Sequence, residues 1–306
     1  MRVTLLGTAA GGGFPQWNCA CRMCAACRGR AAGVRPRTQD CIAVSPTGRG
    51  WFLVNASPDI RAQIVASPDF TPGPGPRDTP LRGVLLTDAE LDHALGLVML
   101  REGGGLRVWA PPAVAHALEH DFGVRGVVAR YRQWDWEIAE PGAEFEITEP
   151  GGERLLVTAI PVSGKRPRYA ADSAAEGHWV CAYRISDPAT GGTLLYAPCL
   201  ASWPEGFDEL VAGVDCLILD GTFHSAGEMP GATGSAVGGG EQKSMGHIPI
   251  SGPGGSLELL RAHPRVRRIY THLNNTNPVL DKGSPEHAEL AAAGVEVPRD
   301  GTTFEL

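Results

Sequence analysis

Four cysteines within nine residues form the densest group of reactive side chains in this sequence of 306 residues. They follow the pattern Cys19-x-Cys21-x-x-Cys24-x-x-Cys27. Thiolates at this spacing can surround one soft cation, and zinc in a tetrahedral site is the most common choice. The usual iron–sulfur spacings do not match the pattern. Nothing indicates an open coordination position, so we expect a structural zinc site in a Cys-rich loop at about residues 17–28.

A second group of chemically active side chains lies in the segment Thr87–Leu97, which reads Thr-Asp-Ala-Glu-Leu-Asp-His-Ala-Leu-Gly-Leu. It follows an apolar stretch typical of a strand and runs into a helical pattern. Carboxylates and an imidazole at Asp88, Glu90, Asp92 and His93 can bind harder metal ions or transfer protons. Two interpretations of Asp88 and Glu90 stay open: carboxylates favoured by the dipole at a helix start, or general acid/base groups.

Short apolar segments bounded by turn signals predict the elements that must position these groups. The predicted strands are Val3–Leu6, Ile42–Ser45, Trp51–Asn55, Gly83–Thr87, Leu106–Ala110, Leu155–Ile160, Trp179–Ile185, Leu194–Ala197, Cys216–Asp220 and Arg268–Thr271. The predicted amphipathic helices are Asp59–Ala66, Leu91–Arg101, Pro112–Asp121, Phe207–Val211, Ser256–Ala262 and Ser284–Ala293. Strands with helices spread among them indicate an α/β protein.

The composition excludes several classes of protein. With 43% hydrophobic and 20% charged residues the chain is not disordered, and 40 Gly and 25 Pro without a three-residue period exclude collagen. Apolar runs are too short to span a bilayer, and a net charge of −7 gives no general attraction to nucleic acid. The N-terminus shows no signal-peptide pattern, so we expect one cytoplasmic domain over residues 1–306 with reduced cysteines.

The second group resembles the signature of metallo-β-lactamase-fold hydrolases. In that fold a His-x-His-x-Asp-His motif follows a strand and is itself followed by a small residue and Gly. Here Asp88 and Glu90 stand at the two leading His positions, whereas Asp92 and His93 match. The resemblance implies an α/β fold of the αββα type, a sandwich of two mixed sheets flanked by helices.

Two later segments extend this resemblance. The bridging Asp of the fold matches Asp220, and its last His matches His272. The mid-chain His would fall at Ser163 or Gly164, so that ligand is missing. The resemblance therefore implies that the first metal site has been lost and the second retained, with the ligands Asp92, His93, Asp220 and His272. Two histidines and one carboxylate with open positions are typical of non-heme Fe(II) oxygen chemistry, although these ligands also suit zinc.

Five segments resemble the family of coenzyme PQQ (pyrroloquinoline quinone) synthesis protein B: residues 7–19, 55–61, 87–96, 244–250 and 272–278. The resemblance implies a role in making PQQ from a Glu–Tyr unit of a precursor. One function described for the family is iron-dependent, O₂-using hydroxylation of the tyrosine ring. The alternative is a non-catalytic carrier of PQQ or its precursor toward the periplasm. Four hard ligands and the lack of a membrane segment favour the enzyme.

The expected ligands and partners follow from this resemblance. We expect a structural Zn²⁺, an active-site Fe²⁺ that zinc can replace in purified protein, and a small-molecule or dipeptide substrate derived from Glu-Tyr. PQQ itself would be a bound product. The sequence leaves open whether the chain forms a homodimer.

The fourth ligand of the cysteine site is implied by related phosphodiesterases of this fold. There a His after the bridging Asp completes a Cys-x-Cys-x-x-Cys zinc site. The equivalent here is His247, which we prefer to Cys27. An active-site role for His247 stays open, because another branch of the fold uses a His there catalytically.

Further polar residues adjoin the expected active site. Lys165, Arg166 and Arg168 follow the vacated mid-chain position and are candidates for binding carboxylates of substrate or product, or for a solvated basic loop. Asn274 and Asn275 follow His272 and are candidates for orienting it or the substrate.

Overall fold

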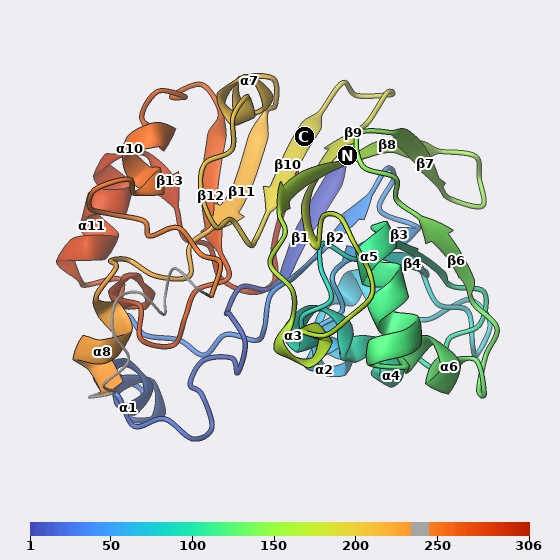
Figure 1. The fold of residues 1–306 in the computed structure, drawn as a ribbon, viewed down its shortest axis with the longest axis horizontal. Coiled ribbons are helices and arrows are strands. Elements are labelled where there is room, and N and C mark those ends of the chain that lie inside the picture. The colour runs from blue at the N-terminus through green and yellow to red at the C-terminus, as the bar shows by residue number, and fades with distance from the viewer. Residues whose placement is uncertain (234–244) are drawn as a thin grey trace. The chain divides into compact units, whose positions relative to one another are not determined.

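The computed structural model describes residues 1–233 and 245–306. Residues 234–244, which include Ser244 at the start of one family motif, lie outside the described residues. Within the described part, strands form two mixed sheets of seven strands each, flanked by helices, which confirms the predicted α/β class (Figure 1). No helix among these residues is long and apolar enough to cross a membrane.

The first sheet has parallel and antiparallel neighbours. Its order is β14 (Thr302–Glu305), β1 (Arg2–Gly7), β2 (Cys41–Ser45), β3 (Trp51–Val54), β4 (Leu81–Leu85), β5 (Arg107–Ala110) and β6 (Asp135–Ile138). The order of the second sheet is β13 (Val295–Glu296), β12 (Arg267–Thr271), β11 (Cys216–Asp220), β10 (Thr193–Ala197), β9 (Val180–Ser186), β8 (Arg154–Ser163) and β7 (Glu144–Thr148).

The chain divides into two compact units. The first unit comprises Met1–Gly7, Asp40–Leu194 and Gly301–Leu306, and the second unit comprises Thr8–Gln39 and Leu195–Asp300. The chain passes from the first to the second within β10. The expectation of one domain over residues 1–306 stays a prediction.

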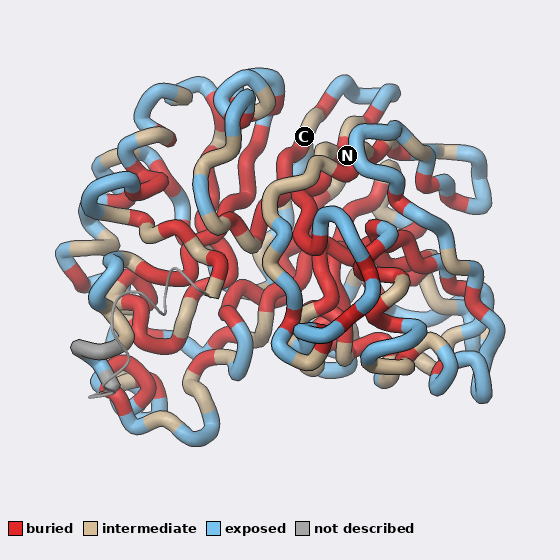
Figure 2. The backbone as a smooth tube through the Cα atoms, viewed as in Figure 1, coloured by how far each residue is buried: buried red, intermediate tan, exposed pale blue. Residues whose placement is uncertain are grey.

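Helices of the first unit pack on the first sheet. They are α2 (Ile60–Ala66), α3 (Leu91–Ala94), α4 (Gly96–Met99), α5 (Pro112–His116) with the π-helical turn Ala117–Asp121, α6 (Val124–Val128), and the 3₁₀ turns Pro68–Phe70 and Arg168–Ala170. Their buried side chains, including Ile60, Leu97 and Val114, join Leu53 and Val84 of the sheet in one apolar core. Figure 2 shows these central strands buried and the connecting loops exposed. Removing this apolar surface from water is the main stabilising contribution.

The structure also describes helices in the second unit. They are α1 (Arg22–Arg28), α7 (Phe207–Ala212), α8 (Glu228–Thr233), α10 (Ser256–Leu260), α11 (Pro285–Ala292) and the 3₁₀ turn Pro278–Leu280. α11 begins at Pro285, and the Ser284 side chain caps it by accepting a hydrogen bond from the His287 N–H at 3.0 Å. Figure 1 shows α10 and α11 beside β12 and β13.

Two local expectations need correction. The Cys-rich segment 17–28 is not all loop, because α1 covers residues 22–28. The predicted helix Leu91–Arg101 is two short helices that meet at Leu95 and Gly96. Gly96 lies so close to the backbone of residues 56–57 that no side chain fits there, since an added Cβ would lie 2.2 Å from Ser57 O.

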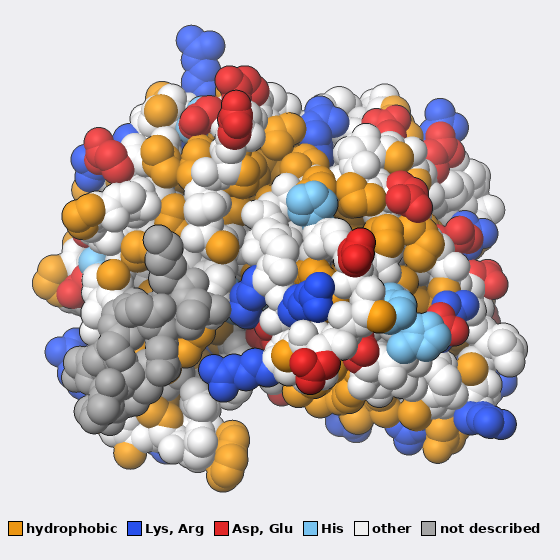
Figure 3. Space-filling model, in the orientation of Figure 1, with side chains coloured by type: hydrophobic (Ala, Val, Ile, Leu, Met, Phe, Trp, Pro, Cys, Tyr) orange, Lys and Arg blue, Asp and Glu red, His pale blue; other side chains and the backbone are white. Residues whose placement is uncertain are grey.

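Charged side chains of both signs are interspersed on the surface seen in Figure 3. This distribution agrees with the small net charge of −7.

Candidate metal centres

Three of the four clustered cysteines lie together in the second unit. The Sγ atoms of Cys19, Cys21 and Cys24 all lie within 4.8 Å of one another. Cys21 is the N-cap of α1, where its Sγ accepts a hydrogen bond from the Cys24 N–H. Cys27 is on the same helix but outside this group, and no described histidine belongs to the group. Three converging thiolates suit the zinc site that the sequence predicts.

Burial controls the acidity of these thiols. Burial raises the pKa of Cys24 to about 11. Burial opposes ionisation of Cys19 too, but hydrogen bonds from Cys21, Cys24 and Asn275 outweigh it and lower the pKa of Cys19. Metal binding requires thiolates, so uptake of zinc here would release protons.

Two parallel strands bring a carboxylate and an imidazole together in the second unit. β11 ends at Asp220 and β12 ends at Thr271, and these residues are paired in register. The carboxyl ends of parallel neighbours meet at one edge of a sheet, so His272 lies beside Asp220. His247 joins them, and one ligand atom of each of the three lies within 4.8 Å of the others. Two imidazoles and one carboxylate suit iron(II) or zinc.

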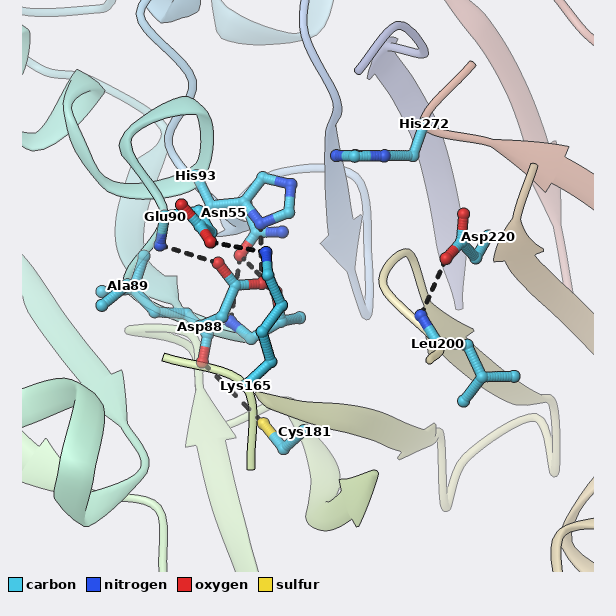
Figure 4. A network of polar contacts seen from close by, with 12 residues as sticks. Asn55, Asp88, Ala89, Glu90, His93, Lys165, Cys181, Leu200, Asp220 and His272 are labelled. Atoms are coloured by element: carbon cyan, nitrogen blue, oxygen red, sulfur yellow. Dashed lines mark hydrogen bonds and ion pairs between the residues drawn. The ribbon is translucent and has the colours of Figure 1, made fainter. Parts of the chain in front are cut away.

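Thr222 holds this group together. Its hydroxyl lies 2.7 Å from Asp220 Oδ1 and 2.8 Å from Nδ1 of His272. Asp220 Oδ2 accepts a hydrogen bond from the Leu200 N–H at 2.8 Å (Figure 4) and lies 2.7 Å from Nδ1 of His247. Burial would raise the pKa of Asp220, but the two imidazoles and Thr222 outweigh it and lower that pKa. The carboxylate therefore remains charged, as a metal ligand must.

The expected role of His247 is corrected by this placement. Its Nδ1 lies 2.7 Å from the buried Asp220 carboxylate, and its ring stacks on His272 with centroids 5.1 Å apart. It does not lie in the cysteine group. The physical reason is that a buried carboxylate needs a hydrogen-bonded partner. The other interpretation left open by the sequence, an active-site histidine, fits this position.

An apolar cavity adjoins His247 within the second unit. Its volume is about 430 Å³, and its walls include Trp203, Phe223, Ile248 and Pro249. Pockets lined by aromatic and aliphatic side chains with a few polar groups bind small organic ligands. This cavity therefore combines an apolar surface with one histidine of the metal-binding group.

A chain of hydrogen bonds fixes the ring of His93 in the first unit (Figure 4). Asn55 follows β3, and its Oδ1 accepts hydrogen bonds from the backbone N–H and the hydroxyl of Thr87, each at 3.0 Å. The Thr87 hydroxyl lies 2.8 Å from Asp88 Oδ2, which is 2.7 Å from Nδ1 of His93. Since Nδ1 faces this carboxylate, a metal at His93 would bind through Nε2. Carboxylates commonly orient metal-binding histidines in this way.

The same carboxylates set the charge of His93. Burial alone would lower its pKa, but Asp88 and Asp92 outweigh burial and raise the pKa to about 10. Burial also disfavours the charged form of Asp88, yet the charge and hydrogen bond of His93 lower the pKa of Asp88. Asp88 is 1% exposed, so it is not a solvated carboxylate at a helix start. Its contacts are those of a group that positions His93.

The predicted basic residues have separate contacts. Lys165 Nζ forms an ion pair with Glu90 at 2.8 Å. The guanidinium of Arg166 donates hydrogen bonds to the backbone oxygens of Ser173 and Ala175, and it lies 5.3 Å from the ring centroid of Trp179. These contacts hold the loop of Arg166 in place, and the expectation that Arg166 binds a cofactor stays a prediction.

The other predicted binding residues lie on a 3₁₀ turn and in the loop after β12. Arg168 is exposed on the 3₁₀ turn Arg168–Ala170. Asn274 donates a hydrogen bond to the Thr276 hydroxyl at 2.6 Å, whereas Asn275 points to the cysteine sulfurs.

The four predicted active-site ligands are divided equally between the units. Asp92 and His93 lie on α3 of the first, and Asp220 and His272 lie in the second; their joint binding of one ion stays a prediction.

Comparison with known proteins identifies the family. A model described as the β-lactamase superfamily domain matches residues 50–273. Coenzyme PQQ synthesis protein B of Pseudomonas aeruginosa (strain LESB58) is 41% identical over 311 aligned positions, which cover 100% of both chains. The chain belongs to the family of coenzyme PQQ synthesis protein B. This result confirms the resemblance inferred from the sequence motifs.

Solved structures confirm the metallo-β-lactamase fold. The Zn²⁺-bound synthesis protein of this family from Methylobacterium extorquens has a TM-score of 0.90 at 39% identity, over 100% of both chains. A diphosphatase from the PhnP family has a TM-score of 0.66 at 18% identity and covers 100% of this chain and 97% of its own. The second similarity concerns the fold alone.

Proposed function

We propose that this chain acts in PQQ biosynthesis as an enzyme that hydroxylates the tyrosine ring of a Glu-Tyr-derived precursor, using O₂ and one non-heme Fe(II). The relatives named coenzyme PQQ synthesis protein B support the pathway. The observation that carries the chemistry is the group of Asp220, His247 and His272, whose ligand atoms lie within 4.8 Å of one another. Two histidines and one carboxylate are the donors typical of Fe(II) oxygenases.

The proposed ligands of the iron are Asp220 and His272 of this group, together with Asp92 and His93. In this assignment Thr222 orients His272, and Asp88 orients His93, each through Nδ1. Fe(II) would supply the activation of O₂ that no amino-acid side chain provides. His247 lies beside Asp220 and supplies either a further ligand or a donor to that carboxylate.

The remaining residues are proposed to bind and orient the precursor. The apolar cavity next to His247 suits an aromatic ring, because Trp203 and Phe223 are among its walls. Lys165, which pairs with Glu90, suits a carboxylate of the precursor. Excluding water from such a cavity also protects reactive intermediates from side reactions.

The electron balance of this reaction defines what the assay must contain. One oxygen atom enters a ring C–H bond as hydroxyl, and the other is released as water. The ring supplies two electrons, and an external two-electron reductant must supply the other two. Ascorbate fulfils this requirement in a purified system.

The test is anaerobic loading with Fe(II), followed by O₂ uptake with a Glu–Tyr dipeptide and ascorbate. We expect O₂ consumption that depends on the dipeptide and falls at least about 100-fold in His272→Ala, since a ligand is lost. Tight binding of PQQ without O₂ consumption for any tyrosine-derived precursor would instead support the carrier, and the hydroxylase would be withdrawn.

A further inference from the structure

The side chain of Asn275 reaches all three sulfurs of the cysteine group. Its terminal amide nitrogen lies 3.2 Å from Sγ of Cys19, 3.7 Å from Cys21 and 3.3 Å from Cys24. Asn275 is buried, with 6% of its surface exposed. Rotation of the carboxamide by half a turn exchanges its nitrogen and oxygen, so either atom can occupy this point.

The distances match a tetrahedral site with an oxygen in the fourth position. With a metal–sulfur bond of about 2.3 Å and a metal–oxygen bond of about 2.1 Å, tetrahedral angles require a sulfur–oxygen separation of about 3.6 Å. The side-chain amide nitrogen lies 3.2, 3.7 and 3.3 Å from the three sulfurs, each within about 0.4 Å of this value, and half a turn of the carboxamide would bring its oxygen to the same point. We propose that the carboxamide oxygen of Asn275 is the fourth ligand of the metal bound by Cys19, Cys21 and Cys24.

The other candidates for this position are placed less well. His247 contacts Asp220 at 2.7 Å, and Cys27 is not in the cysteine group. The backbone oxygen of Asn275 lies 3.7 Å from Sγ of Cys21 and 4.0 Å from that of Cys24. The backbone oxygen contacts two of the three sulfurs, whereas the side-chain amide contacts all three and can turn its oxygen toward the metal.

This assignment ties two distant segments of the second unit together. Asn275 comes three residues after His272, in the loop that follows β12. Leu273 in the same loop is paired with the N-terminal segment through Leu273 N–H to Thr8 O at 2.9 Å and Ala10 N–H to Leu273 O at 2.9 Å. A metal held by both segments would fix the loop that carries His272.

Variants at position 275 test the proposal through zinc affinity, measured by competition with a chromophoric chelator. Asn275→Ala should weaken zinc binding at least about 10-fold, whereas Asn275→Asp keeps an oxygen ligand and should retain wild-type affinity. Asn18→Ala is the matched control. Asn18 adjoins Cys19 in sequence, but its side chain contacts Gln16 instead of a sulfur, so zinc affinity should not change.

Two results would overturn the proposal. If Asn275 only donates N–H groups to thiolates, the aspartate variant loses these donors and adds negative charge, so it should bind zinc as weakly as Asn275→Ala. An unchanged affinity in Asn275→Ala would assign the position to the backbone oxygen or to water.

Spectroscopy tests the proposal without relying on variants that fold poorly. X-ray absorption of the zinc-loaded wild-type protein should show three sulfurs and one oxygen or nitrogen at this site, and four sulfurs would contradict the proposal. In Co(II)-loaded Asn275→Cys, a fourth thiolate should increase the sulfur-to-cobalt charge-transfer absorption. No increase in the folded variant would place residue 275 outside the coordination sphere.

Discussion

Single hydrogen bonds decide which nitrogen of each proposed histidine ligand faces a metal. Asp88 lies 2.7 Å from Nδ1 of His93, and the Thr222 hydroxyl lies 2.8 Å from Nδ1 of His272. Both partners are buried, and both follow a strand end. Such contacts fix ring orientation and raise ligand basicity. We therefore propose that Asp88 positions His93.

Asp88→Asn should weaken active-site iron binding roughly 10- to 100-fold while all four proposed ligands remain. The variant removes the charge that orients His93 and one of the carboxylate acceptors. Iron affinity measured by anaerobic titration checks this expectation. Glu90→Gln is the matched control, because Glu90 pairs with Lys165 and not with His93. Equal affinity in Asp88→Asn and wild type would contradict the positioning role.

Glu228 has a half-buried carboxyl group whose protonation should affect folding. Burial raises its pKa from 4.5 to about 7, although the Thr276 hydroxyl and the His224 N–H donate hydrogen bonds to it. The folded protein therefore keeps this proton up to about pH 7, whereas the unfolded chain releases it near pH 4.5. Stability should consequently fall as the pH rises through this window.

Glu228→Gln mimics the protonated carboxyl and should remove this pH dependence. Near pH 8 the variant should be more stable than wild type by about 1–3 kcal/mol, and at pH 4.5 the two should be similar. Denaturant unfolding at both pH values measures the difference. A gap that is the same at both pH values would show that the Glu228 carboxyl does not titrate in this range.

The sequence predicted much of the site but not the residues that orient it. Cys19, Cys21 and Cys24 converge as their spacing indicated, and Asp220 and His272 lie together at neighbouring strand ends. Thr222 and Asn55 were missed, because an isolated polar residue after a strand carries no local signal of its contacts. The role of His247 was misassigned since its partner Asp220 is distant in sequence, and only the fold brings the two side chains together.

At the scale of elements, α3 is held by a close approach between backbones. The Ala56 N–H donates to His93 O at 2.7 Å, and the Gly96 N–H donates to Ala56 O at 2.9 Å. Gly96 permits this approach because it lacks a Cβ. The contact positions the helix that carries Asp92 and His93.

Gly96→Ala should therefore destabilise the protein by roughly 2–4 kcal/mol, because the new methyl group would overlap the backbone oxygens of Ala56 and Ser57. Displacement of α3 should also weaken iron binding. Gly126→Ala is the control: it lies within α6 with nothing within 4 Å of its added Cβ, so stability should stay equal or rise. Equal stability of both variants in denaturant unfolding would contradict the close approach.

Element prediction was best where apolar patterns were strong. The ten predicted strands all correspond to observed strands, and both ends lie within two residues of the expected bounds except at β8 (Arg154–Ser163), which extends three residues further. The helix α1 was missed because its residues read as a metal-binding loop, and β7 was missed because its burial is incomplete. Leu91–Arg101 was predicted as one helix since its period continues through Gly96, where tertiary contact sets the break.

At the scale of the whole molecule, we propose that the chain holds a structural metal site and a separate redox site. The cysteine group offers soft sulfur donors, and the Asp220 group offers harder oxygen and nitrogen donors. These donor sets favour different metals. Zinc bound at the first and iron at the second would give one stabilising ion and one reactive ion in each chain.

The most direct test of the proposed hydroxylation is mass spectrometry of the product formed under ¹⁸O₂. The Fe(II)-loaded protein is given a Glu–Tyr dipeptide and ascorbate, with His272→Ala as the control. We predict one ¹⁸O atom in the tyrosine ring for each hydroxylation, with no label in the ring when ¹⁸O is supplied as water. A ring that acquires no oxygen from O₂, while the iron-loaded protein remains folded, would contradict the account.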